Sequence, residues 1–479
     1  MYLKSLKIQN IKCFENITID FSQGKDIRHW TTLFGKNGLG KSTLLQAIAV
    51  VLAGPAAMRE LLPVAEGWVR KGSSYGEITA ELIWTEGDSV TAIAQAGKAK
   101  KKSPYSVRYI VTGNDLESLP ENLEERFANT IMQWSGGETR KERENLTKDK
   151  KRLQQTAYVE GKTGWFACGY GPFRRLSGGE REAERILYAE RKAARFLTLF
   201  KEEAALTNVT EWLIRLHNMA RENDSKSAKA LEQVKKVFAE KLFPEKVQLE
   251  ITAKAAMLKI GEKEFFPLRD LSDGYRSMLS LMIDLVHWLI RAFPDAENPM
   301  ECPGIVLIDE LDAHLHPEWQ RHIGYWLREK FPNLQFIIAT HSGFLAQVSE
   351  GEDSEGDKER RETQHSGSNI KLEQTDEGVI IKTDFEPTEN LRVDQIYQSD
   401  LFDMESVYSP LVEKKVARHE ALHQAIHKNE ISAKEREEYE QLSLWRERLL
   451  MLPNLEERQI EKTLRDAIKR HEKKLKEME

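Results

Sequence analysis

The feature that most constrains this chain is the glycine-rich segment from Gly35 to Ser42, Gly-Lys-Asn-Gly-Leu-Gly-Lys-Ser, which has the spacing GxxxxGK[ST]. In such a loop, backbone N–H groups face phosphate oxygens, the lysine reaches the β and γ phosphates, and the hydroxyl binds magnesium. The flanks fit, because residues 30–34 are strand formers and residues 43–52 are apolar helix formers. The sequence therefore predicts an ATP site, with nucleotide contacts from Gly35, Asn37, Gly38, Gly40, Lys41, Ser42 and Thr43.

A second segment far downstream supplies the carboxylates that such a site needs. Residues 305–308, Ile-Val-Leu-Ile, are an apolar run that ends in Asp309 and Glu310, which is the pattern of a buried parallel strand. We expect Asp309 to hold Mg²⁺ together with Ser42, and Glu310 to polarise the attacking water, since an adjacent pair separates a metal ligand from a general base. The next apolar run ends in His341, which we expect beside the γ-phosphate.

Two segments compete for the signature sequence that would make this an ABC-type ATPase rather than a RecA-like one. Residues 176–180, Leu-Ser-Gly-Gly-Glu, match the ABC consensus by letters but lie far upstream of Asp309. Residues 271–275, Leu-Ser-Asp-Gly-Tyr, depart from the consensus, yet apolar residues at helical spacing lead from them directly to the strand that ends at Asp309. We therefore assign the signature to Ser272, Asp273 and Gly274 and interpret residues 176–180 as a glycine turn.

Four segments together resemble the ABC-type ATPases of the SMC, RecF and OLD group. They are the opening apolar pattern from Leu3 to Phe14, LSDGYRSMLSL at 271–281, IDELDAHLHP at 308–317 and ATHS at 339–342. Within this group, GYGPFRRLSG at 169–178 is similar to the ATPase subunits of Septu-type and retron-associated anti-phage defence systems, the PtuA family. The resemblance implies a head-to-tail ATPase dimer, or a higher oligomer, that controls a separate HNH nuclease subunit attacking DNA.

The same resemblance implies how the site is shared between two copies. One protomer would supply Lys41, Ser42, Asp309, Glu310 and His341, while Ser272 and Gly274 of the other would cap the γ-phosphate. Asp312 stands in the D-loop, which crosses the dimer interface, and Lys12 stands where relatives carry a basic residue that approaches the nucleotide. The Q-loop glutamine is not placed: Gln154 and Gln155 lie in a charged stretch, and residues 170–175 are the alternative.

The expected fold class is α/β, an ABC-type ATPase head in which a P-loop NTPase core with a mixed sheet is flanked by helices. Residues 1–189 would form its N-terminal part with the phosphate loop, and residues 190–245 a helical insertion. Residues 246–390 would carry the signature, the Walker B strand and the H-loop, interrupted by a mobile acidic loop at 350–368. Residues 391–479 are expected to be a helical region for oligomerisation or effector docking.

Composition limits the remaining possibilities. The chain has 479 residues, of which 40% are hydrophobic, so more than one folding unit is expected. No run approaches the roughly 20 apolar residues of a membrane span, and the N-terminus lacks a signal pattern, which favours a cytoplasmic protein. Cys13, Cys168 and Cys302 are widely separated, so reduced thiols are expected rather than a zinc site or disulfides.

The net charge of −6 argues against a chain that coats nucleic acid. Basic clusters at 98–102 and 140–152 either contact phosphates or are solvated, and the lack of interleaved aromatic residues favours solvation. Whether this chain contacts DNA directly or only through its complex is left open.

Nuclease activity is not expected in this chain. No DxD pair of an OLD-type nuclease follows His341, and His419, His423 and His427 are spaced as one polar helix face more readily than as a metal site. The expected chemistry is ATP hydrolysis with Mg²⁺. Two alternatives remain open: a stand-alone repair ATPase of RecF or SMC type, and, with less support, the ATPase subunit of a transporter.

Overall fold

The computed structural model describes most of the chain. The described residues are 1–23, 26–63, 65, 67–85, 104–112, 131–133, 139–158, 165–174, 192–204, 206, 209–239, 247–261, 264–348, 369–376, 378–385, 387–388, 390–428 and 431–450. Contacts divide the chain into two units, Met1–Asp403 and Met404–Glu479, which are described separately. Among the expected segments, the Lys98–Lys102 cluster, residues 175–180, the acidic stretch 350–368 and residues 451–479 lie outside the described residues.

The central sheet of the first unit has six strands in the order β16-β15-β5-β14-β13-β9. Their bounds are Gly378–Lys382, Asn369–Thr375, Trp30–Phe34, Leu334–Ala339, Gly304–Ile308 and Ala167–Tyr170, respectively. Every neighbouring pair is parallel except β15 with β16. Strands β5, β13 and β14 are buried along their whole length, which explains why their sequences are nearly continuous apolar runs. The sheet is mixed, as the expected fold class requires.

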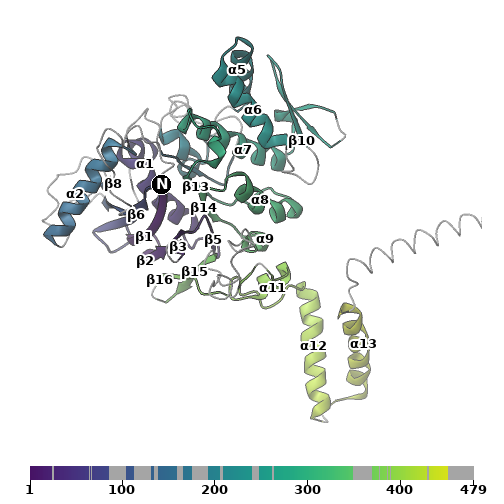
Figure 1. Cartoon of the computed structure of the whole chain (residues 1–479). Helices are drawn as coiled ribbons and strands as arrows, with labels where there is room; N and C mark the ends of the chain where they lie inside the picture. The colour runs from purple at the N-terminus through teal and green to yellow at the C-terminus, as the bar shows by residue number, and fades with distance from the viewer. Residues whose placement is uncertain are drawn as a thin grey trace, which may run out of the picture. The chain divides into compact units, whose positions relative to one another are not determined.

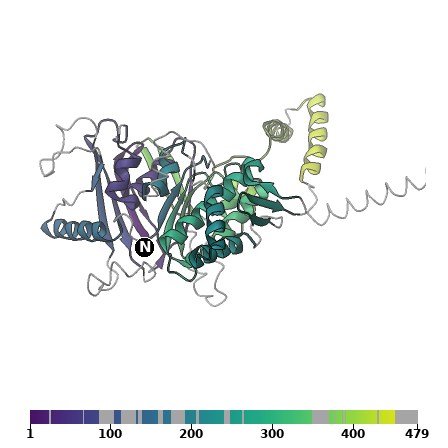
Figure 2. The same cartoon turned by 90° about the horizontal axis from the view of Figure 1, so that it is seen from above.

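A second, antiparallel sheet has the order β2-β1-β6-β7-β8. Its strands are Phe14–Asp20, Tyr2–Ile11, Tyr75–Ile83, Tyr105–Thr112 and Ile131–Gln133, respectively. Helix α1, Lys41–Leu61, contacts strands of both sheets and lies between them (Figures 1 and 2). The buried Gln335 side chain also links the sheets, because its amide accepts from the Leu3 N–H at 2.8 Å and donates to the Leu3 carbonyl at 2.9 Å.

Helix α1 corrects one expectation from the sequence. Among the described residues it is the one helix long and apolar enough, by length and composition, to cross a membrane, and 72% of its apolar window is buried within the protein. Its apolar faces are covered by the two sheets, so burial between sheets explains the composition. Gln46, Arg59 and Glu60 interrupt the apolar run, and Gly54, with φ of 81°, and Pro55 place a kink inside the helix.

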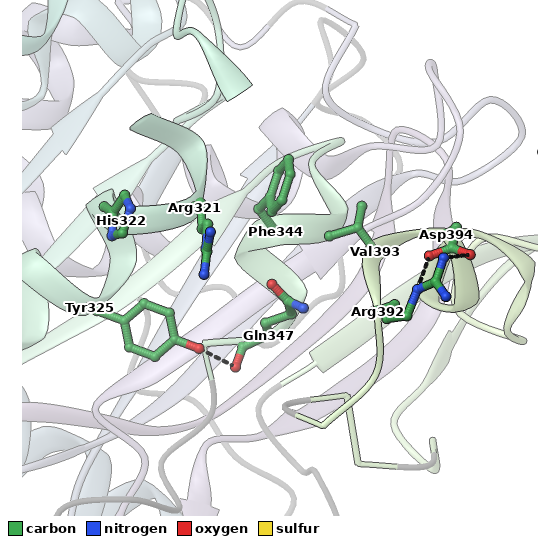
Figure 3. Close-up of a pocket in the computed structure, with 8 residues that line it drawn as sticks. All are labelled: Arg321, His322, Tyr325, Phe344, Gln347, Arg392, Val393 and Asp394. Atoms are coloured by element: carbon green, nitrogen blue, oxygen red, sulfur yellow. Dashed lines mark hydrogen bonds and ion pairs between the residues drawn. The ribbon is translucent and has the colours of Figure 1, made fainter. Parts of the chain in front are cut away.

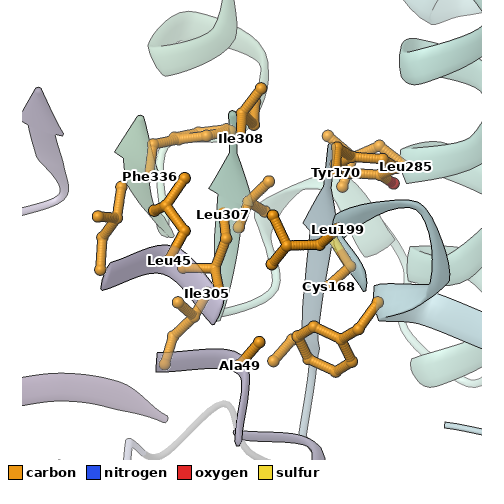
Figure 4. Close-up of a cluster of buried hydrophobic side chains, with 14 of the residues drawn as sticks. Leu45, Ala49, Cys168, Tyr170, Leu199, Leu285, Ile305, Leu307, Ile308 and Phe336 are labelled. Atoms are coloured by element: carbon orange, nitrogen blue, oxygen red, sulfur yellow. The ribbon is translucent and has the colours of Figure 1, made fainter. Parts of the chain in front are cut away.

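The buried cluster beneath the nucleotide loops joins α1 and the central sheet to the signature helix. Figure 4 shows side chains from α1, β9, β13 and β14 packed together with Leu199 of α4, Leu197–Phe200, and Leu285 of α7, Asp273–Ala292. Tyr170 adds a polar link, since its hydroxyl donates to Asp284 Oδ2 on α7 at 3.0 Å. This hydrogen bond and the packing around it join α7 to strand β9.

Residues 190–245 contain helices among their described positions, and a small sheet follows. Helix α5 packs against α6, and both contact α7. The sheet β10-β11-β12 is antiparallel. The bounds are α5 Val209–Arg221, α6 Ser225–Ala239, β10 Val247–Ile251, β11 Ala256–Ile260 and β12 Phe266–Pro267.

The remaining elements are short or lie at the surface. They are β3 Ser22–Gln23, β4 Asp26–Ile27, α2 Arg140–Gln155, η3 Lys192–Phe196, η4 Leu268–Asp270, η5 Pro299–Glu301, α8 Pro317–Lys330, α9 Gly343–Ala346 and α11 Val393–Gln398. The second basic cluster forms α2, which contacts β7, and Gln154 and Gln155 are exposed at its end. The three cysteines are free thiols.

The second unit contains a helical hairpin of α12, Pro410–His427, and α13, Ala433–Leu450. Arg418 binds Glu438 with two hydrogen bonds of 3.1 and 2.8 Å. His419 stacks on Tyr439 with ring centroids 4.8 Å apart, and His423 meets His427 at 4.5 Å. Within the described part of the chain, no group of three or more His, Cys, Asp or Glu residues is arranged to hold a metal. His419 is buried, whereas His423 and His427 are exposed.

His287 on α7 generates a prediction about acid stability. The side chain is 2% exposed, and both ring nitrogens lack a hydrogen-bond partner in the described structure. Its ring lies 4.7 Å from that of Trp212 and 5.0 Å from that of Trp288. Burial, with help from Arg291, lowers the pKa of His287 to about 3. The native protein therefore keeps this imidazole neutral under conditions in which an unfolded chain protonates it.

We expect the free energy of unfolding to fall as the pH drops below about 6.5, the ordinary histidine value, with His287 contributing about 1.4 kcal/mol per pH unit until about pH 3. His287→Phe keeps a ring in the cluster and removes this contribution. Urea unfolding at pH 7, 6 and 5 measures it. Equal pH slopes in the two proteins would contradict the assignment.

Candidate nucleotide site

The phosphate loop joins β5 to α1 and depends on glycine at position 40. Gly40 has φ of 91° and precedes the first turn of α1. A Cβ there would lie 2.5 Å from Cys13 Sγ and 2.7 Å from Phe14 Cζ. Gly38 also has a positive φ, 82°, but a Cβ there would meet nothing within 4 Å. Asn37 is exposed on the same loop, whereas Thr43 is buried in the helix.

Lys41 is folded back over this loop. Its Nζ donates to the carbonyl of Gly35 at 2.7 Å and to that of Lys36 at 3.2 Å, and the side chain is 8% exposed. Burial lowers the pKa of Lys41, and the charges of Asp309, Glu310 and Asp312 oppose that shift. The ammonium group is therefore held at the mouth of the loop, with three carboxylates near enough to influence it.

Asp309 and Ser42 form the part of the site suited to a divalent cation. Asp309 follows β13 and is 3% exposed, and its Oδ1 has no hydrogen-bond partner among the described residues. The pKa of Asp309 is raised, because burial outweighs the opposing effect of a hydrogen bond with Ser42. A carboxylate oxygen left unpaired beside a hydroxyl is the hard oxygen donor set that Mg²⁺ prefers, so these residues fit the expected metal.

Glu310 and His341 lie on the exposed side of the same site. The Glu310 side chain is exposed, and its backbone is left-handed with φ of 49°. His341 follows β14. Its pKa is lowered by partial burial and by the charge of Lys41, and the charges of Asp312 and Glu310 only partly oppose this shift. The structure therefore brings His341, Glu310 and Lys41 into one electrostatic cluster.

Asp312 stabilises the loop that follows Glu310. Its carboxylate accepts hydrogen bonds from the hydroxyl of Thr340 and, at 3.4 Å, from the backbone N–H of His341. Gln320 of α8 completes the connection, because it donates to the Asp312 carbonyl at 3.5 Å and accepts from the Ser342 hydroxyl at 2.7 Å. The loops after β13 and β14 are thus tied together by side chains.

The residues predicted to form the signature lie at the start of α7, against the loop that contains Asp312. Ser272 precedes the helix, and Ser272 and Asp273 are exposed. A Cβ at Gly274 would lie 2.5 Å from the His314 carbonyl oxygen, so only glycine permits this close approach. Asp273 forms an ion pair with Arg276. The charge of Asp273 is therefore balanced within the same helix turn.

Lys12 occupies a tight position between β1 and β2. Its φ is 46°, its N–H donates to the Trp68 carbonyl at 2.7 Å, and its Nζ lies 5.0 Å from the centre of the Trp68 ring. Burial lowers the pKa of Lys12. The neighbouring Cys13 thiol donates to the Leu39 carbonyl at 3.6 Å. Lys12 therefore lies close to the phosphate loop, through the contact of its neighbour Cys13 with Leu39. Its ammonium group packs against the indole ring of Trp68.

Arg174 is a residue of the site whose position the sequence did not reveal. It follows β9, is 5% exposed, and its Nη2 donates to the carbonyls of Asp309 at 2.7 Å and of Glu310 at 2.8 Å. From the sequence, residues 170–175 are a candidate loop to replace the glutamine, and the Arg174–Arg175 pair is a candidate for a functional role, but the contacts of Arg174 are not predicted. The GYGPFR sequence marks the segment as unusual. It does not indicate which backbone groups the Arg174 guanidinium contacts.

A separate pocket of about 600 Å³ lies between α8, α9 and α11. Its lining includes Arg321, Tyr325 and Arg392, and the Tyr325 hydroxyl donates to the Gln347 carbonyl at 3.0 Å (Figure 3). Arg392 is paired with Asp394 at its rim. None of the predicted nucleotide contacts lines this pocket, so it is distinct from the predicted ATP site.

The parallel strands, the phosphate loop and the acidic end of β13 define a P-loop ATPase domain of the AAA type. The chain belongs to the family described as "AAA domain, putative AbiEii toxin, Type IV TA system", whose model matches residues 31–346.

Two curated relatives confirm the similarity inferred from the motifs. The Septu protein PtuA of Bacillus mycoides (strain KBAB4) is 28% identical over 344 residues, which cover 71% of this chain and 38% of that protein. The Retron Ec83 probable ATPase of Escherichia coli is 27% identical over 380 residues, covering 70% of this chain and 68% of that protein. The chain therefore spans well under half of the first relative's length.

Among solved structures, the Smc head bound to the C-winged helix domain of ScpA aligns with a TM-score of 0.44 and 16% identity. The alignment covers 80% of this chain and 97% of that one.

The contrast between Gly40 and Gly38 gives a test of the loop. We expect Gly40→Ala to lower the free energy of unfolding by about 2–4 kcal/mol, because it adds overpacking to a left-handed backbone. Gly38→Ala should cost only about 1 kcal/mol, since its methyl group meets no atoms. Urea unfolding of both variants measures the difference. Equal losses would show that the Cys13 and Phe14 contacts do not fix the loop.

Proposed function

We propose that this chain binds ATP with Mg²⁺ and hydrolyses it as the ATPase subunit of an anti-phage defence complex. The observation that carries the ATP assignment is the meeting of a buried Lys41, the unpaired Oδ1 of Asp309 and the exposed carboxylate of Glu310 at one edge of the central sheet. Lys41 would offset charge on the β and γ phosphates, and His341 would contact the γ-phosphate. Gly35, Asn37, Gly38, Gly40 and Thr43 would surround the remaining phosphate oxygens.

Ser42 and Asp309 would hold Mg²⁺, which when bound offsets the charge that develops on the phosphate oxygens. Glu310 would accept the proton of the attacking water. Its exposed side chain leaves room for that water, while the neighbouring Asp309 stays buried and committed to the cation. The two adjacent carboxylates thus take different tasks because their environments differ.

A second copy of the chain would complete the site. Ser272 and Asp273 are exposed at the start of α7, and Gly274 lies against the loop of Asp312. This is consistent with a surface on which signature and D-loop are presented together to a partner, in a head-to-tail dimer. Lys12 would approach the nucleotide only after leaving the Trp68 ring.

The defence role is supported by the relatives' names, Septu protein PtuA and Retron Ec83 probable ATPase. We infer that the chain controls a separate HNH nuclease subunit in the cytoplasm, and that its ATP state changes the conformation of that effector. The α12–α13 hairpin, which forms its own compact unit, is a suitable docking or oligomerisation element.

Two substitutions test the ATPase assignment. Lys41→Ala should abolish ATP binding, whereas Glu310→Gln should bind ATP normally and lower kcat by about 10²–10⁴-fold, because only the general base is lost. Steady-state phosphate release and titration with a fluorescent ATP analogue measure these effects. Full hydrolysis by Glu310→Gln would remove that residue from the mechanism.

Mixing variants tests the shared site. Lys41→Ala and Ser272→Arg should each be inactive alone, whereas their equimolar mixture should recover about a quarter of wild-type activity, since half of the dimers are mixed and carry one intact site. No recovery, with dimers still detected by light scattering, would contradict a signature that acts across the interface.

Purification from native cells with and without ATP tests the partner. We expect an HNH nuclease to copurify in an ATP-dependent amount and to be identified by mass spectrometry. Lys41→Ala is the matched control, because it should lose the ATP dependence. Tight DNA binding by the isolated chain, without such a nuclease, would favour the stand-alone repair ATPase of RecF or SMC type.

A further inference from the structure

We propose that Arg174 is a positioning residue, which aims the Glu310 carboxylate at the attacking water by holding the backbone of Asp309 and Glu310. This inference rests on the proposed ATPase function. Its basis is the pair of hydrogen bonds from one guanidinium nitrogen, Nη2, to two consecutive carbonyls, at 2.7 and 2.8 Å. The hydrogen bonds of the guanidinium go to the main chain of the two residues, while its charge also lies near the carboxylates of Asp309, Asp312 and Glu310, which oppose the lowering of its pKa by burial.

The Asp309–Glu310 backbone needs such support because it leaves the sheet abruptly. The pairing of β13 with β9 ends at Ile308, opposite Tyr170. Glu310 then adopts a left-handed backbone with φ of 49°, which costs a residue with a side chain about 1–2 kcal/mol. The conformation persists only if neighbouring groups fix it.

The fixing groups come mainly from one segment on each side. The Asp309 N–H donates to the Tyr170 carbonyl at 2.8 Å. Arg174, four residues after Tyr170, donates to the carbonyls of Asp309 and Glu310. On the other side, the Ala313 N–H also donates to the Glu310 carbonyl, at 2.9 Å. The segment from Tyr170 to Arg174, at the end of β9, thus holds the backbone of Asp309 and Glu310 from one side. The loop that follows Glu310 holds it from the other side, through the Ala313 N–H.

The location of Arg174 distinguishes it from a surface cation. It is 5% exposed, and its Nε and Nη1 have no hydrogen-bond partner in the described structure. Burying a guanidinium with incomplete pairing is costly. A residue needed only to fill this space would be better served by an apolar side chain, so the charge and the donor geometry point to a task at the site.

Arg174→Lys tests the inference, since it keeps the charge but shortens the side chain and removes the planar guanidinium. We expect kcat to fall at least about tenfold, because displacing a catalytic group by about 1 Å has effects of this size or more. ATP affinity should change by less than about threefold, because Lys41 and the phosphate loop are untouched. A Kd loss that matches the kcat loss would overturn the proposal.

A double-mutant cycle separates positioning from general destabilisation. If Arg174 acts through Glu310, adding Arg174→Lys to Glu310→Gln should lower the residual hydrolysis by less than about twofold. Independent effects that multiply would overturn the proposal. Arg195→Lys is the matched control, because Arg195 is a partly buried arginine 5.4 Å from the Trp288 ring, away from the site; it should leave kcat unchanged.

Hydrogen exchange supplies a readout that does not depend on activity. The Ala313 amide should exchange at least about tenfold faster in Arg174→Lys, while the urea midpoint stays close to that of Arg195→Lys. Unchanged exchange at Ala313 would overturn the proposal even if hydrolysis falls. If Arg174→Lys does not fold, Arg174→Gln takes its place with the same expectations. A wild-type chain that fails to hydrolyse ATP would refute the proposed function, yet the exchange result would still show whether Arg174 holds this backbone.

Discussion

Parallel pairing of β5, β14 and β13 is the constraint on which the nucleotide site depends. Because neighbouring parallel strands end at the same edge of a sheet, the phosphate loop, the Asp309–Glu310 pair and His341 arrive side by side. Their positions in the chain are hundreds of residues apart at the extremes. Backbone hydrogen bonds between the strands therefore bring these side chains together. Helix α1 stabilises the arrangement by packing between the two sheets.

Around that edge, polar contacts set the electrostatic state of each group. Lys41 and Asp309 are both buried and have pKa values shifted toward neutrality by burial, yet each is near an opposite charge. An anionic nucleotide and a divalent cation are the ligands that would compensate these two groups together. Binding of such a pair would offset the cost of burying these two charged groups.

The signature helix is joined to this edge by two routes. Tyr170 reaches Asp284 of α7 from β9, and Gly274 approaches the His314 carbonyl beyond Glu310. Arg174 contacts the carbonyls of both acidic residues. Hydrogen bonds and close packing thus connect α7 to the segments that carry the two carboxylates.

Sequence by itself determined the parts whose chemistry is local. The loop spacing, the apolar run before Asp309 and the helix after Ser272 each specify their own structure, because glycine conformations, strand burial and helical periodicity are short-range properties. Only the tertiary structure decided which groups meet. It buried α1, which composition alone cannot distinguish from a membrane helix, paired Asp273 with Arg276, and brought Arg174 to a backbone 135 residues away. Such contacts depend on strand order and on the path of the chain, which no local pattern encodes.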